Sequence, residues 1–549
     1  MSTAGGRPSN TVSLPLKRPS LGNLDDQKSR TPVGTVNTFE DVAPTGSISA
    51  RPHRTARHRV GSSLMRRTTT TWSLPAVTFV LVVPLTLLTI AQPAVSLGLL
   101  LAAISVIGFL RAPWLTVPVT VVLAYTAFPK VIPRSIQLGA MSGYLYEITL
   151  LLALVFVLAR RPPRRSTDVA GSIVLGLTTV FLVFGVATGN PTNPAINDAR
   201  GLIIVGIATI VSGRVFGYPE AMKTVRVLKW SLWFSATMVV LGQFGVELHG
   251  ASEDAGLSFA GAGERALSGA ERFLTSATHA SLATVCISLA LVITHRARLR
   301  TVAPWLIPGL IVVFFSFSRN SILAVGVAVI YAIVASRLFR SAMTALVALV
   351  FGGVAAGVMY GFAIASSSEG PLGWLAVQIN AYVARVVDGI SPAVISVDTS
   401  AQYRNRESEL LLSSWMQSPI QGHGMGEAYR VPVGSPDSFT ATSGIYYGHN
   451  FYLWLGVKAG IVGLAVILLV FLVPLMRRMT DAPTPVVGAS AALAGLLVAS
   501  YVAPFPLGVE SGASMLIGIL LGTVTRWPRE HASQSLRSKS VRPLPIHAS

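Results

Sequence analysis

Long apolar runs alternate with short polar segments through most of this 549-residue chain. Each run is long enough to cross a bilayer, which takes about 17–25 residues of α-helix. Because backbone polar groups inside a bilayer must bond within their own segment, helices are expected, and the alternating stretches of a β-barrel are missing. The pattern predicts an all-α integral membrane protein. It places about 14 spans, at 73–91, 94–110, 112–129, 144–160, 168–187, 200–216, 228–246, 273–294, 302–317, 320–336, 342–366, 449–475, 484–504 and 510–525.

The polar segments divide the chain into five parts. Residues 1–72 carry 11 Lys and Arg against 4 Asp and Glu and show no apolar period, which predicts a disordered basic tail. Residues 73–366 hold the N-terminal spans, and residues 367–448 form a large loop. Within this loop, the spacing of Leu410, Leu411 and Trp415 predicts a helix at 401–418. Residues 449–525 hold the C-terminal spans, and residues 526–549 form a second basic tail. The first apolar run begins too far along the chain for a cleavable signal peptide.

Loop charges indicate how the spans are oriented. If the first tail is cytoplasmic, the inner loops at 160–166, 213–229 and 295–300 are all basic. The outer loop at 247–273 then carries five acidic residues: Glu247, Glu253, Asp254, Glu264 and Glu271. The positive-inside rule therefore predicts a multi-pass protein of the cytoplasmic membrane with both termini cytoplasmic. It also predicts that the large loop, 367–448, is extracytoplasmic.

Composition agrees with this class. The chain is 51% hydrophobic and 12% charged, whereas soluble domains carry about 25% charged residues. The net charge of +20 lies largely in the tails and inner loops, where it suits anionic lipids better than nucleic acid. The single cysteine, Cys286, forms no internal disulfide and offers no cysteine metal site.

Candidate chemistry lies at the predicted outer ends of the spans. Arg200 is the first residue of one predicted span, and Arg319 lies in a short polar break between two apolar runs. Arg404 and Arg406 lie in the large loop, and His449 follows the loop directly, at the start of the next span. A lone arginine there would more often extend to the lipid headgroups. Several arginines and a histidine on one face favour a site instead, because charges near the membrane are costly unless they are paired or hydrated.

These residue types suggest a particular kind of reaction. Arginine forks suit phosphate or pyrophosphate groups, and histidine serves as a general base near neutral pH. Together they indicate a phosphate-bearing leaving group and an activated hydroxyl. At an outer membrane face, the matching donor is a sugar on a polyprenyl pyrophosphate.

Three sequence blocks carry a family resemblance: FSFSRNSILA at 315–324, YRNRESELLLSSWMQSPIQGHGMG at 403–426 and HNFYLWLGVKAGIVGL at 449–464. In this order, around one large loop, they resemble the O-antigen ligase and polymerase family of bacterial multi-span glycan transferases. The family's spacing to Pro419 selects Arg404 over Arg406. The chain departs from the family at Asn320, where Gly is common, and at Lys458, where Glu is frequent.

The resemblance implies a GT-C-like architecture with about 12–14 transmembrane helices. It also implies transfer of a glycan from a polyprenyl-pyrophosphate carrier to an acceptor hydroxyl, without metal or cofactor. His449 would be the general base, with Asn450 beside it in support. Arg319, Arg404 and Arg200 would hold the pyrophosphate.

Three further residues are possible supporting members of the site. Arg406 lies near Arg404 in the large loop. His279 stands at an outer span end, where it either lines the cavity or is core or lipid-facing structure. His423 stands in the Pro-x-x-Gly-x-Gly turn, where a small apolar residue is usual; it is interpreted as loop surface, with acceptor contact as the alternative.

Two other functions fit parts of the pattern. A lipid-glycan flippase or other polytopic transporter would also have many spans and cationic cavity groups. Transporters often contain repeated halves and broken spans, and no repeat is evident here. A membrane scaffold with signalling tails is the third hypothesis. The sequence leaves open whether the enzyme is a ligase or a polymerase and whether the acceptor is a glycan, a lipid or a protein.

Overall fold

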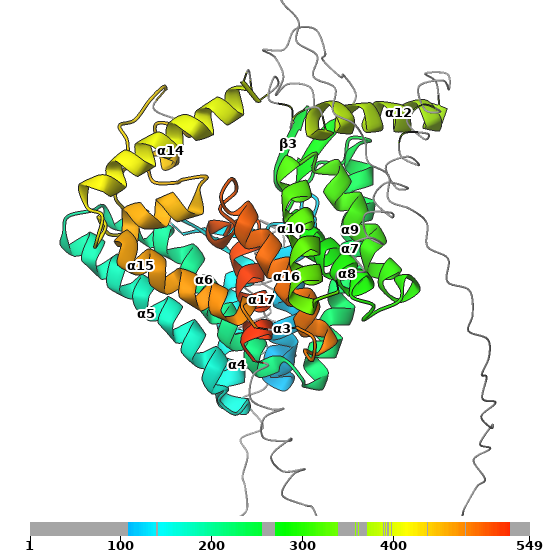
Figure 1. Cartoon of the computed structure of the whole chain (residues 1–549), viewed down its shortest axis with the longest axis horizontal. Coiled ribbons are helices and arrows are strands. Elements are labelled where there is room, and N and C mark those ends of the chain that lie inside the picture. The colour runs from blue at the N-terminus through cyan, green and yellow to red at the C-terminus, as the bar shows by residue number, and fades with distance from the viewer. Residues whose placement is uncertain are drawn as a thin grey trace, which may run out of the picture. The chain divides into compact units, whose positions relative to one another are not determined.

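The computed structural model describes residues 108–138, 141–254, 270–338, 357, 361, 370–387, 389, 391, 395–396, 398–435, 438–477 and 479–526 (Figure 1). The predicted disordered tail, the span at 73–91 and nearly all of the spans at 94–110 and 342–366 lie outside these residues. Almost all of the second predicted tail also lies outside them.

The described residues are mostly helical. The α-helices are α3 (Thr116–Tyr125), α4 (Leu145–Arg160), α5 (Arg165–Ala187), α6 (Thr192–Val215), α7 (Pro219–Gly242), α8 (Ala277–Ile293), α9 (Leu299–Phe315), α10 (Arg319–Ser336), α12 (Gly370–Tyr382), α14 (Thr399–Gln417), α15 (Phe451–Leu475), α16 (Thr484–Ala499) and α17 (Ala513–Thr525). Within the described part of the chain, α5, α6, α7, α10 and α15 are long and apolar enough to cross a membrane. Helices α8, α9, α16 and α17 are apolar but shorter. The chain is therefore a helical membrane protein.

Two helices begin eight and nine residues earlier than their apolar runs predict. Helix α6 begins at Thr192 rather than at residue 200, and α7 begins at Pro219 rather than at 228. Proline suits the first turn of a helix, because the missing N–H has no partner there anyway. In α7 the polar first turn is also held by Glu220, whose carboxylate pairs with Arg161 at 2.6 Å. Hydropathy detects only the apolar part of such a helix, so both starts were predicted too late.

Two short hairpins interrupt the all-helical pattern. Strand β1 (Ser135–Leu138) pairs antiparallel with β2 (Met141–Tyr144), and β3 (Ala251–Asp254) pairs antiparallel with β4 (Glu271–Leu274). Both hairpins lie mostly in segments predicted as loops, but their second strands extend into the predicted spans, at residue 144 and at residues 273–274. The all-α prediction therefore holds for the bundle and not for these connections.

Small residues let helices of the bundle pack closely. Helix α6 packs against α5 and α17, and α10 packs against α16. A Cβ at Gly518 of α17 would lie 2.5 Å from the carbonyl oxygen of Val205 in α6. A Cβ at Gly495 of α16 would lie 2.3 Å from the carbonyl oxygen of Ala324 in α10. Glycine is needed at both places because the two helix backbones touch.

Helix α15 is broken at its centre. Gly460 has φ 60° and ψ −170°, so the predicted continuous span consists of two half-helices. A turn of the large loop satisfies the freed backbone groups: Ile461 N donates to the carbonyl oxygen of Pro419 at 2.8 Å, and His423 N donates to that of Val457 at 2.8 Å. Irregular backbone at membrane depth is tolerated only where the protein supplies such partners. The turn, residues 419–426, thus belongs to the helical core.

The break makes Gly460 a site where any side chain is costly. A Cβ there would lie 2.1 Å from the carbonyl oxygen of Ile420, in addition to the strain of a positive φ. We expect Gly460→Ala to lower the free energy of unfolding by at least about 2 kcal/mol, measured by denaturant unfolding in detergent micelles. The matched control is Gly326→Ala in α10, where a Cβ would meet nothing within 4 Å. Equal free energies of unfolding for the two variants would contradict the conclusion that α15 is broken at Gly460.

Candidate active site

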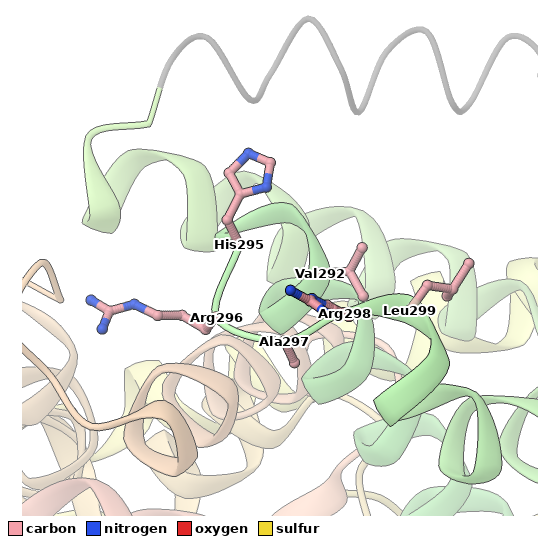
Figure 2. Close-up of a pocket in the computed structure, with 6 residues that line it drawn as sticks. All are labelled: Val292, His295, Arg296, Ala297, Arg298 and Leu299. Carbon is pink, nitrogen blue, oxygen red and sulfur yellow. The ribbon is translucent and has the colours of Figure 1, made fainter. Parts of the chain in front are cut away.

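One surface hollow can be set aside first. A hollow of about 580 Å³ lies at the α8–α9 connection, lined by Val292, His295, Arg296, Ala297, Arg298 and Leu299. Figure 2 shows that the side chains of His295 and Arg296 point in different directions from each other. None of the predicted site residues lines it. It belongs to the basic loop that the charge pattern predicts on the cytoplasmic side.

Helix α14 is the element that carries the site. Its N-cap is Asp398, whose side chain accepts a hydrogen bond from Ser400 N at 2.9 Å. It ends just before Pro419, as helices commonly do before proline. Its apolar face packs on the first half of α15, where the Trp415 ring lies so close that Gly456 has no room for a Cβ. The helix predicted at 401–418 is therefore present and lies against the span that follows the loop.

The start of α15 fixes the position of His449. The side-chain oxygen of Asn450 accepts hydrogen bonds from Tyr452 N and Leu453 N at 3.1 and 3.2 Å, which caps the helix. Asn450 is 2% exposed. Its contacts are those of a cap, so it supports the site by placing His449 directly before the first turn of α15.

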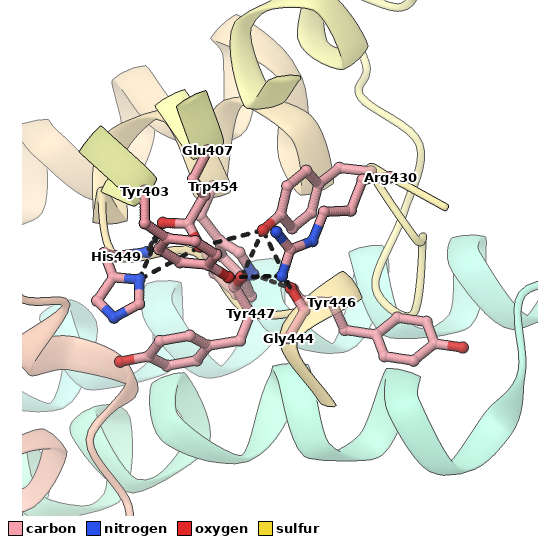
Figure 3. A network of polar contacts seen from close by, with 9 residues as sticks. Tyr403, Glu407, Arg430, Gly444, Tyr446, Tyr447, His449 and Trp454 are labelled. Carbon is pink, nitrogen blue, oxygen red and sulfur yellow. Dashed lines mark hydrogen bonds and ion pairs between the residues drawn. The ribbon is translucent and has the colours of Figure 1, made fainter. Parts of the chain in front are cut away.

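His449 is paired with a buried carboxylate. Its Nδ1 lies 3.0 Å from Glu407 Oε2, and its backbone N–H donates to the same oxygen at 2.7 Å. The Glu407 side chain is 1% exposed and the His449 side chain 26%. An ionised Glu407 accepts a hydrogen bond from Nδ1–H and leaves Nε2 as the acceptor nitrogen. Nε2 points away from Glu407 (Figure 3) and has no hydrogen-bond partner in the described part of the chain.

Aromatic residues surround this pair. The Tyr429 hydroxyl donates to Glu407 Oε1 at 3.1 Å. The rings of Tyr403 and Tyr447 stand edge-on to His449, with centroids 6.0 and 5.3 Å away. Burial raises the pKa of Tyr447, and the nearby Glu407 carboxylate raises it further. Both tyrosine rings restrict the imidazole to one orientation.

Arg404 and Arg319 differ in how they are held. Arg404 lies about one turn before Glu407 on α14. Burial lowers the pKa of Arg404, and the neighbouring charges of Arg319 and Arg272 lower it further. No carboxylate within the described ranges forms an ion pair with Arg404. Arg319, by contrast, forms an ion pair with Asp398 and donates from Nη1 to the carbonyl oxygen of Gly389 at 2.8 Å.

The other predicted arginines have partners elsewhere. Arg200 pairs with Glu147 of α4, with its Nε 2.7 Å from Oε1, and its guanidinium lies over the Tyr144 ring. Among the residues that the structure describes, no contact joins Arg200 to His449 or Arg404. Arg406 is exposed and pairs with Glu409 at 3.1 Å, one turn along the surface of α14. Arg404 is thus coupled by charge to Arg319 and is linked to His449 through Tyr447, whereas Arg200 and Arg406 have no such link among the described residues.

The two additional histidines occupy structural positions. His279 packs edge-on against Phe505, with ring centroids 4.9 Å apart. His423 is half-buried rather than on the loop surface as predicted, because its turn pairs with the broken helix. Its Nε2 lies 3.0 Å from the carbonyl oxygen of Ser414. Neither histidine contacts His449 within the part of the chain that the structure describes.

Lys458 serves the fold. It is fully buried, and its Nζ lies 2.6 Å from Asp198 Oδ2 and donates to the carbonyl oxygen of Glu427 at 2.6 Å. Gly426 N donates to the same Asp198 carboxylate at 2.8 Å. The pair joins α6, α15 and the turn that fills the break. Where the family often has Glu, this chain has Lys458, and Asp198 in α6 supplies the buried acidic partner that this lysine needs.

Sequence reasoning missed three acidic residues: Glu407, Asp398 and Asp198. For Glu407 a signal existed, because residues three apart share one face of a helix and Glu407 follows Arg404 at that spacing. Asp398 was also open to prediction, since Asp followed by Thr and Ser is typical of a helix N-cap. Nothing near Asp198 in the sequence indicates its partner, which is distant in the chain.

The fold and the site define a helical membrane protein with a His–Glu pair beside arginines at the start of a span. Residues 304–468 match the family model described as O-antigen ligase, which confirms the resemblance. The match includes α10, α14 and the first half of α15, and therefore all the paired site residues. No curated protein and no solved structure shows a significant match to the chain. The match supports an enzyme of ligase-type glycan transfer.

Breaking the buried Lys458–Asp198 pair should destabilise the protein. Lys458→Met leaves the Asp198 charge buried without a cation, which costs about 3–5 kcal/mol. In the double variant Lys458→Met/Asp198→Asn we expect much of that loss to be recovered, because no uncompensated charge remains. The measurement is denaturant unfolding in micelles. Lys130→Met is the control, since its pair with Glu247 is exposed and should change stability by less than about 1 kcal/mol.

Proposed function

We propose that this protein transfers a glycan from a polyprenyl-pyrophosphate carrier to an acceptor hydroxyl on the outer face of the cytoplasmic membrane. The observation that carries the proposal is the Glu407–His449 pair with its unpartnered Nε2 beside Arg404. The O-antigen ligase match over residues 304–468 supports the transfer of a glycan in general. The outer placement rests on the basic loops predicted for the opposite side.

The reaction follows from the orientation of His449, whose Nδ1 faces Glu407 and whose Nε2 is left for a substrate (Figure 3). Nε2 accepts the proton of the acceptor hydroxyl as its oxygen attacks the anomeric carbon of the donor sugar. The bond between that carbon and the pyrophosphate oxygen breaks, and polyprenyl pyrophosphate leaves with the bonding electrons. Glu407 holds the imidazole through Nδ1 and stabilises the imidazolium that forms. No energy source is needed, because the pyrophosphate linkage is already activated.

The three arginines differ in how directly they would act on the pyrophosphate. Arg404 faces the leaving pyrophosphate, because it lies on the same helix as Glu407 and has no ion-pair partner in the described residues. Arg319 adds positive charge beside it while paired with Asp398. A direct role for Arg200 in holding the pyrophosphate stays a prediction, and its pairing with Glu147 gives no support for it.

A transporter is the second function considered, and the broken α15 is the feature that favours it. In transporters the backbone groups freed by such a break bind substrate or ions. Here the turn at 419–426 takes up freed groups of α15, so they are not available to a cargo. Purified protein in vesicles separates the two functions, because a transferase changes covalent bonds and a flippase does not.

The first test concerns His449. We expect His449→Ala, expressed at the normal level, to lower glycan transfer by at least about 100-fold while carrier-linked glycan accumulates in the membrane. Glu407→Gln should give a smaller loss, because the imidazole remains but its orientation and charge partner are weakened. Both glycan pools are measured by extraction and chromatography. Unchanged pools in His449→Ala would refute the proposed function.

The second test separates the two arginines of α14. Arg404→Gln should lower transfer by about 100-fold, since it removes the cation that stabilises the leaving pyrophosphate. Arg406→Gln is the matched control on the same helix, and its exposed side chain should leave transfer within about twofold of the wild type. Transfer is measured with purified protein and lipid-linked glycan. Equal losses in both variants would show that charge on α14 matters in general and that Arg404 has no specific role.

A further inference from the structure

Asp398 holds two parts of the protein together with one carboxylate. Its Oδ1 accepts a hydrogen bond from Ser400 N at 2.9 Å and caps α14. Its Oδ2 forms the ion pair with Arg319, the first residue of α10. The Asp398 side chain is 1% exposed and the Arg319 side chain 27%. The beginning of α14 is therefore tied to the beginning of α10.

Arg319 uses two of its five N–H groups on partners within the protein. Nη2 is used by Asp398, and Nη1 donates to the carbonyl oxygen of Gly389. The rest of the side chain lies against Gly389, where a Cβ would come within 3.3 Å of Arg319 Cδ. A guanidinium binds a phosphate best through two parallel N–H groups, and each terminal nitrogen of Arg319 already gives one of its two N–H groups to the protein. Arg319 is built into a contact between segments.

The same helix carries the reactive part of the site. Arg404 and Glu407 follow Asp398 by six and nine residues along α14, a rise of about 9 and 14 Å. A small tilt of α14 at its first turn would therefore displace both residues relative to His449. A misplacement of about 1 Å can cost about 100-fold in rate.

We propose that Asp398 is a positioning residue for the transfer reaction: by holding Arg319, it fixes α14 so that Arg404 meets the pyrophosphate and Glu407 meets His449. The inference rests on the proposed function and assigns Arg319 a role that differs from direct pyrophosphate binding. Burial by itself would raise the pKa of Asp398, but the hydrogen bond and charge of Arg319 lower it below the usual value. The carboxylate is therefore ionised at neutral pH, as the pair requires.

The test is Asp398→Asn in the full-length protein, reconstituted in lipid bilayers with lipid-linked glycan as donor. Asparagine is as good an N-cap as aspartate, so the helix cap is kept and only the ionic contact is lost. We expect kcat per folded molecule to fall by about 10- to 100-fold while the KM for the donor changes by less than about threefold. A purely structural role would reduce the amount of folded protein and leave kcat per folded molecule unchanged.

A lower KM for the donor with an unchanged kcat in Asp398→Asn would overturn the inference. If Arg319 binds the pyrophosphate and Asp398 competes for it, Asp398→Asn frees the guanidinium. The KM for the donor would then fall and kcat would be kept. A loss of folded protein with normal kcat and KM would equally refute a positioning role.

A double-mutant cycle gives an independent readout. Arg319→Gln and Asp398→Asn break the same pair, so the double variant should be no more than about twofold worse than the poorer single variant. Multiplied losses in the double variant would mean that the two residues act separately, which would overturn the inference.

Two controls separate this inference from the proposed function. Asp481→Asn changes an exposed aspartate in the α15–α16 connection and should leave kcat and KM unchanged. His449→Ala is measured in the same assay. If it is inactive while Asp398→Asn has wild-type kinetics, only the positioning role fails. If His449→Ala is fully active, the proposed function itself fails.

Discussion

The contact on which the site depends is the one between the buried Glu407 carboxylate and His449. A buried carboxylate is stable only if several donors satisfy it. Glu407 meets this requirement with the His449 backbone N–H, its ring Nδ1 and the Tyr429 hydroxyl. These donors come from separate places in the large loop and from the start of α15. The requirement therefore fixes α14 and the end of the loop together, and it also determines which imidazole nitrogen is left to accept a proton.

The second constraint is the break in α15. A span interrupted at Gly460 exposes backbone groups that a bilayer cannot satisfy, and the turn at 419–426 supplies the partners. The fully buried Lys458 and its partner Asp198 hold the same region from the side of α6. The large loop is consequently anchored at its turn as well as along α14. This explains how residues in a long connection can be held as firmly as residues in a helix.

Whether an arginine already has a carboxylate partner indicates whether it holds helices together or is available to bind an anion. Arg200 and Arg319 each have a buried or half-buried carboxylate partner, whereas Arg404 has none among the residues described. A guanidinium that is already paired contributes mainly to the arrangement of its helices. An unpaired guanidinium among other cations is the one that gains most from an incoming anion. These three arginines, all predicted to hold the pyrophosphate, thus have different surroundings.

The sequence by itself determined the class of protein, the resemblance to the O-antigen ligase family and the helix at 401–418, because hydropathy, charge and short motifs are local properties. It also singled out His449, Arg319 and Arg404 as candidate site residues. It did not determine Glu407 as the partner of His449, Asp198 as the partner of Lys458, or the break at Gly460. These depend on contacts between segments up to hundreds of residues apart, which no local pattern encodes. The run of α15 contains one charged residue, Lys458, but its hydropathy predicts a single continuous span. Only the structure, with the backbone angles of Gly460 and the contact with the turn at 419–426, showed that the helix is broken.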